Sequence, residues 1–98
     1  MFVILLDYVK PIEEIERLLT PHREFLDRYY AKGRFICSGP LKPRTGGLIL
    51  CNASDRSEVD SIIKEDPFYQ NEAAEYTLVE FEPLKASDAF KGCICQEG

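Results

Sequence analysis

The sequence has little histidine, methionine or tryptophan, and its charge is predominantly acidic. Tryptophan is absent, histidine and methionine occur once each, and 12 basic residues face 17 acidic ones. The net charge of −5 removes the electrostatic attraction on which most nucleic-acid binding depends, so nucleic acid is not an expected partner. With His22 as the single histidine, a metal site would need distant cysteines to converge, so no metal or other cofactor is expected.

Long apolar runs and export signals are also missing. The longest apolar run, Phe2 to Leu6, is far shorter than the ~20 residues that cross a bilayer, and no basic segment followed by an apolar stretch resembles a signal peptide. We therefore expect a cytoplasmic protein with no membrane partner. The cysteines lack the C-x-x-C pairs of a zinc ribbon and are expected to be reduced thiols, with Cys93 and Cys95 incidental.

What remains is ordinary globular composition, because 45% of the 98 residues are hydrophobic. We expect one domain over residues 1–98, with a core over about 1–84 and a tail of little periodicity over 85–98. The patterns predict four strands, at 2–8, 35–38, 48–51 and 76–81. A helix is predicted from Ile12 to an interruption at Thr20-Pro21, followed by a second helical segment that ends at Gly33. A capped helix is predicted from Asp55 to near Glu65, followed by a turn at 66–68.

This order of elements is β-α-β-β-α-β, which is typical of a ferredoxin-like α+β fold with a four-stranded antiparallel sheet. Two helices would cover one face of the sheet. The first strand is expected to be buried on both faces, because Val3 and Leu5 are apolar as well as Phe2, Ile4 and Leu6. An exposed apolar sheet face predicts a homodimer through that face; the alternative is that the C-terminal tail covers it.

His22 and Asp66 are the candidate catalytic pair. The predicted helix start at Thr20 places His22 in a first turn, where the helix dipole favours the neutral imidazole that acts as a base. An exposed histidine without a role is the alternative. Asp66 precedes Pro67 and is suited to cap the next turn, or it accepts the Nδ1–H of the histidine and fixes its tautomer. Spacing leaves both readings open.

Other polar and aromatic residues are candidates for binding rather than for chemistry. Ser38 and Gly39 leave a strand before Pro40 and could lie beside a pocket, although nothing predicts Ser38 as a nucleophile. Tyr8 is a candidate pocket residue together with Tyr29, Tyr30 and Tyr69, whose spacings also fit core positions. Arg34 and Arg44 flank the predicted hairpin and could pair with an anionic substrate.

Taken in order, these features resemble the YCII-related (YciI-like) family of small dimeric α+β barrel proteins. The resemblance rests on the first strand, Thr20-Pro-His22, Ser38-Gly-Pro40, Asp66-Pro-Phe68 and Phe81-Glu-Pro83, and covers roughly residues 1–90. It implies a ferredoxin-like protomer, a tight dimer and a pocket with His22 and Asp66 beside Ser38 and Gly39. Some relatives are similar to dehydrochlorinases and to muconolactone-isomerase-like enzymes. The Cys-x-Cys tail and the short connection between the middle strands depart from the family pattern.

The sequence thus leads to two hypotheses. In the first, His22 is a general base oriented by Asp66 and acts on a small anionic or phenolic molecule, in an elimination or isomerisation that needs no nucleophile and no redox centre. In the second, the chain is a non-catalytic dimeric module for metabolite binding or assembly.

Overall fold

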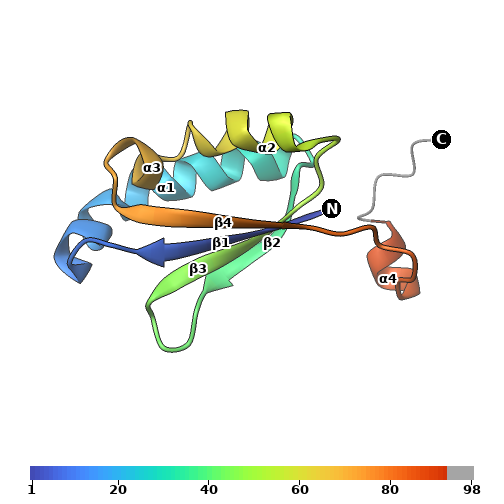
Figure 1. Ribbon diagram of the computed structural model, residues 1–98, viewed down its shortest axis with the longest axis horizontal. Helices are drawn as coiled ribbons and strands as arrows, with labels where there is room; N and C mark the ends of the chain where they lie inside the picture. Colours follow the sequence, from blue (N-terminus) through green and yellow to red (C-terminus); the bar gives the residue numbers. More distant parts are fainter. Residues whose placement is uncertain (93–98) are drawn as a thin grey trace.

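Four strands and three of the helices form a two-layer α+β arrangement (Figure 1). The computed structural model describes residues 1–92. Its elements are β1 (Phe2–Tyr8), α1 (Ile12–Ala31), β2 (Phe35–Pro40), β3 (Gly46–Cys51), α2 (Arg56–Ile63), α3 (Pro67–Gln70), β4 (Ala74–Glu80) and α4 (Asp88–Lys91). The strands form one sheet in the order β2-β3-β1-β4, and every neighbouring pair is antiparallel. This confirms the predicted ferredoxin-like fold.

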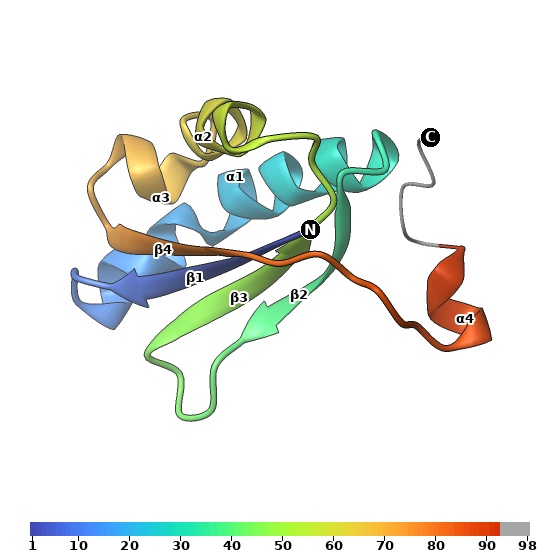
Figure 2. The ribbon, with the colours of Figure 1, turned by 45° about the vertical axis from the view of Figure 1, so that its right-hand side comes forward.

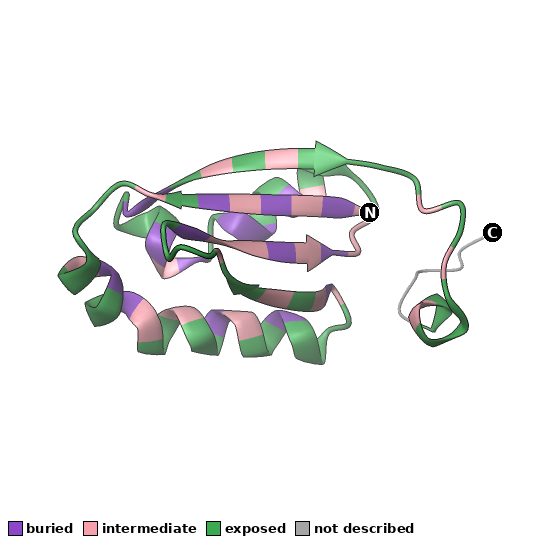
Figure 3. Ribbon diagram, turned by 90° about the horizontal axis from the view of Figure 1, so that it is seen from below, coloured by how far each residue is buried: buried purple, intermediate pink, exposed green. Residues whose placement is uncertain are grey.

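The core lies between the sheet and the helices. Phe2, Ile4 and Leu6 alternate along β1, are buried, and face the layer formed by α1, α2 and α3. Within the single chain β1 is buried on one face only, because Val3 and Leu5 are half-buried. They lie on the opposite face, which the helix layer does not cover (Figure 3).

The predicted interruption at Thr20-Pro21 is wrong, since α1 is continuous from Ile12 to Ala31 with Pro21 inside it. Proline lacks an N–H and removes one hydrogen bond from the helix interior. The buried side chains Leu18 and Phe25 on either side of it nevertheless belong to one stripe that packs onto the sheet. Burial of that stripe outweighs the local cost. His22 therefore lies in mid-helix, and the argument from the helix dipole does not apply.

Local signals set the remaining boundaries. Gly33 has a φ of +75° where the chain leaves α1, as expected for a glycine after a helix. Asp55 caps α2 by accepting a hydrogen bond from Glu58 N, but the Glu58 carboxylate accepts from Ser54 N rather than from Asp55 N. The helix ends at Ile63, slightly before the predicted end near Glu65.

The described part of the tail does not lie across the open face of the sheet. Figures 1 and 2 show the chain running past the end of β4 and away from the strands to α4, and Leu84 on that segment is 83% exposed. Val79, on the open side of β4, is 53% exposed. Cys93 and Cys95 lie outside the described residues.

Candidate functional site

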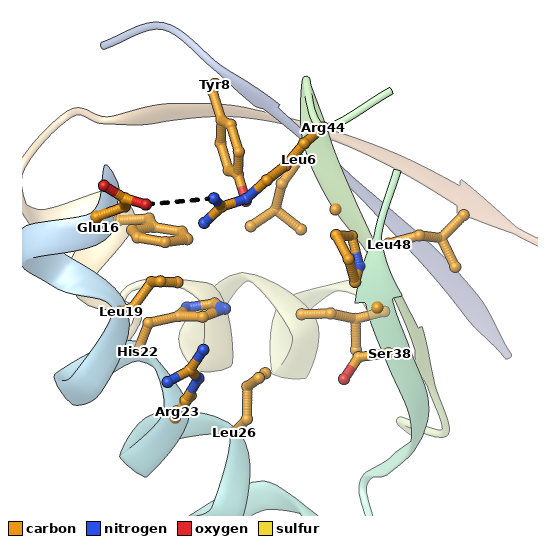
Figure 4. Close-up of a pocket in the computed structure, with 15 residues that line it drawn as sticks. Leu6, Tyr8, Glu16, Leu19, His22, Arg23, Leu26, Ser38, Arg44 and Leu48 are labelled. Carbon is orange, nitrogen blue, oxygen red and sulfur yellow. Dashed lines mark ion pairs between the residues drawn. The ribbon is translucent and has the colours of Figure 1, made fainter. Parts of the chain in front are cut away.

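A pocket of about 460 Å³ lies between α1 and the helix-facing side of β1, β2 and β3, with the β2–β3 loop at its rim (Figure 4). Its volume is in the range of small-molecule sites. Apolar side chains provide much of its wall, namely Leu6, Leu19, Leu26, Ile49 and Phe68. The polar side chains are few and come from α1, β1, β2 and the β2–β3 loop, so they can orient a bound molecule.

His22 enters this pocket from α1 and is bound from behind by Asp66. Its Nδ1 lies 2.8 Å from Oδ1 of Asp66, and the side chains of the two residues are 12% and 1% exposed. A carboxylate oxygen accepts this hydrogen bond, so in the neutral imidazole Nδ1 carries the hydrogen and Nε2 has the free lone pair. The ring stacks on Phe68 with centroids 4.1 Å apart, and its far edge faces the pocket (Figure 4).

Asp66 combines the two roles that its sequence position left open. It is the N-cap of α3, where Oδ1 accepts a hydrogen bond from Phe68 N at 3.0 Å, and the same oxygen accepts from the histidine. Its other oxygen, Oδ2, accepts from the Tyr76 hydroxyl at 2.7 Å. Three donors thus compensate the carboxylate for its complete burial. Burial first, and then the negative charge of Asp66, raise the pKa of Tyr76, which therefore stays a donor.

The other predicted binding residues divide into two groups. Tyr8, Ser38 and Gly39 line the pocket, and the Ser38 hydroxyl is hydrogen-bonded to the Tyr30 hydroxyl at 2.6 Å. Arg44 also lines it, and its guanidinium lies 3.7 Å from the Glu16 carboxylate. Arg34 does not, because it pairs with Glu58 at 2.9 Å on another part of the surface.

Two of the remaining tyrosines have other environments. Tyr29 is a core residue whose hydroxyl donates to Glu65 at 2.8 Å, and burial together with this bond raises the pKa of Tyr29 to about 12. Tyr69 is exposed and packs its ring edge-on against Tyr76. Neither lines the pocket that contains His22.

Sequence reasoning missed part of the site. Glu16, Leu19, Arg23 and Leu26 all line the pocket from α1. Their spacing of three and four residues would have placed them on one face of a continuous helix, but the predicted break at Pro21 divided that face. Tyr76 lies opposite Leu6 on the helix-facing side of β4, and no sequence signal linked it to Asp66.

No metal centre and no membrane span is found in the described part of the chain. Within residues 1–92, no group of three or more histidine, cysteine, aspartate and glutamate side chains is placed to hold a metal ion. In the same range, no helix is both long and apolar enough to cross a bilayer. Cys37 and Cys51 are free, and burial raises the pKa of Cys51 to about 11.

Comparison with known proteins places the chain in a family. No curated protein sequence matches it. Among solved structures, it is similar to 5-chloro-2-hydroxyhydroquinone dehydrochlorinase (TftG) from Burkholderia phenoliruptrix AC1100, in complex with 2,5-dihydroxybenzoquinone, with a TM-score of 0.70 and 18% identity. The match covers 84% of this chain and 94% of the other, and at that identity it shows a shared fold. The model of the YCII-related domain matches residues 1–82, and the chain therefore belongs to the YCII-related family.

Proposed function

We propose that the chain is a small-molecule enzyme in which His22, oriented by Asp66, acts as a general base on a compound bound in the pocket. The reaction class is an elimination or an isomerisation. The observation that carries the proposal is the hydrogen bond from Nδ1 to a buried carboxylate, combined with the position of the opposite ring edge in the pocket. The dehydrochlorinase named for the structural neighbour is itself an elimination enzyme.

The proposed mechanism follows from the contacts of the ring. Nε2 takes a proton from a carbon of the bound molecule, and the electron pair left behind forms a double bond. In an elimination the bond from the neighbouring carbon to the leaving group breaks, and the leaving group departs with that bonding pair. In an isomerisation the imidazolium returns the proton at another carbon. The negative charge of Asp66 stabilises the imidazolium, and stacking on Phe68 holds the ring plane.

Asp66 is itself held by groups that preserve its charge and position. Phe68 N and the Tyr76 hydroxyl donate to its two oxygens, so the carboxylate remains an acceptor for the histidine and cannot rotate freely. We therefore assign Asp66 as the orienting group of the base and Tyr76 as a positioning residue that acts through Asp66.

The test is turnover of chlorinated hydroxyhydroquinones, the compound class named for the neighbour, and of small lactones, by wild type and His22→Gln. General-base catalysis contributes about 10²- to 10⁴-fold, so we expect kcat to fall by that factor while binding persists. Arg56→Gln, an exposed change on α2, is the matched control and should keep full activity. Wild-type turnover by His22→Gln would refute the assignment. Binding without turnover of any compound by wild type would favour the non-catalytic metabolite-binding module.

We also propose that two protomers associate through the open face of the sheet. Val3, Leu5, Leu48 and Leu50 are half-buried on that face, and Val79 beside them is exposed. A contiguous apolar face of this kind is rare on monomeric proteins. Sedimentation equilibrium should give a dimer for wild type and a monomer for Val79→Lys. A wild type that remains monomeric at high concentration would contradict the proposal.

A further inference from the structure

The pocket carries an unusual charge for this protein. The chain has a net charge of −5, yet the charged side chains that line the pocket, besides the histidine, are Arg23, Arg44 and Glu16. Two cations therefore face one anion in the pocket that contains His22. The pocket lining therefore has an excess of positive charge, although the protein as a whole is acidic.

Arg23 is the first of the two cations. It follows His22 in α1 and, in the part of the chain that the structure describes, makes no ion pair. Arginine stays charged at all accessible pH values and presents five donors, so at the pocket wall it is available to a bound anion. Four other arginines already have carboxylate partners: Arg17 with Glu14, Arg28 with Glu65, Arg34 with Glu58 and Arg44 with Glu16.

Arg44 is the second cation. It reaches from the β2–β3 loop to Glu16 on α1, and in Figure 4 its guanidinium and that of Arg23 lie on opposite sides of His22. The ion pair is long, at 3.7 Å, and its side chains are 41% and 58% exposed, so it is a weak interaction. An anion in the pocket can compete with Glu16 for this guanidinium.

We propose that the pocket binds a small organic carboxylate. Its anionic group is held by Arg23 and Arg44, whose planar guanidinium groups match the geometry of a carboxylate. Its apolar body contacts Leu19, Leu26 and Ile49, which brings a carbon of the molecule to Nε2 of the histidine. This inference rests on the proposed function only in taking the pocket as the substrate site, and binding can be measured without turnover.

The probes are benzoate and its neutral counterpart benzamide, titrated into the full-length protein by isothermal calorimetry and by NMR of the single histidine ring. We expect benzoate to bind at least about tenfold more tightly than benzamide, with an affinity that falls as salt is added. Arg23→Gln and Arg44→Gln should each weaken benzoate binding about tenfold and leave benzamide binding unchanged. Glu16→Gln should strengthen benzoate binding, because it releases Arg44 from its competing partner.

The control is Arg56→Gln, because Arg56 is likewise without an ion pair within residues 1–92 but does not line this pocket. It should leave benzoate binding unchanged. Equal binding of benzoate and benzamide, no binding of benzoate, or the same loss in Arg56→Gln as in Arg23→Gln would each overturn the inference. His22→Gln should retain benzoate binding, so a failure of the proposed catalysis is distinguishable from a failure of carboxylate recognition.

Discussion

Replacing Asp66 with alanine should destabilise the protein by about 3 kcal/mol, far more than replacing it with asparagine. The reason is the number of groups that depend on this one buried carboxylate. Loss of the N-cap of α3 costs about 1 kcal/mol. The Tyr76 hydroxyl, left without its acceptor in a partly buried position, adds about 1 kcal/mol, and the loss of the charge-assisted bond from His22 adds about the same.

Asp66→Asn separates the hydrogen bonds from the charge. Asparagine is an equally good N-cap, so its amide oxygen can occupy the position of Oδ1 and accept from both His22 Nδ1 and Phe68 N. Its amide nitrogen then donates to the Tyr76 oxygen, which can accept. Only the charge is lost, and we expect a destabilisation of about 1 kcal/mol.

Urea unfolding, followed by circular dichroism, gives the free energy of unfolding of both variants. The comparison requires that the dependence of this free energy on urea concentration has the same slope in each. In nitrogen NMR, wild type and Asp66→Asn should keep the hydrogen on Nδ1 of the neutral histidine ring, whereas Asp66→Ala should show a mixture of tautomers. The reasoning is refuted if alanine and asparagine destabilise the protein equally, or if the tautomer in Asp66→Ala matches wild type.

Three further outcomes follow from single contacts. The pKa of Tyr29 is raised to about 12. The contribution of this phenol to stability is therefore complete below pH ~10, where the unfolded phenol is neutral, and is lost as pH rises toward 12. The free energy of unfolding should fall less steeply with alkaline pH in Tyr29→Phe than in wild type. Gly46→Ala should destabilise the protein by about 3 kcal/mol in urea unfolding, because the added Cβ would lie 1.8 Å from the Leu6 carbonyl oxygen. A Cβ at Gly39 meets no described atom within 4 Å, so Gly39→Ala, the control, should cost less than about 1 kcal/mol. Pro21→Ala should raise stability by about 1 kcal/mol, since it restores a helical hydrogen bond at an exposed position; a loss of stability on thermal unfolding would show that the proline suits its site.

Short-range hydrophobic patterns predicted the helices and strands, because each pattern depends only on which side chains of that segment are buried. The apolar and β-branched run from Phe2 to Leu6 predicts a strand, and the i, i+3, i+4 spacing of Val59, Ile62 and Ile63 predicts a helix. The order of such segments then restricts the topology to very few arrangements. Where a local signal opposed a long-range one, as at Pro21, the local signal misled, because the packing of the whole helix face on the sheet outweighs one missing hydrogen bond.

The sequence by itself determined the secondary-structure order, the family resemblance and the identity of His22 and Asp66 as candidates. Only the tertiary structure brought these two residues together across 44 positions of the chain, added Tyr76 behind the carboxylate, and placed Arg23 and Arg44 around one pocket. A segment's own pattern records whether a side chain faces the core, but not which other side chain it meets there. The partner depends on how α1 crosses the sheet and on the packing of α3 against α1, and both are properties of the folded chain.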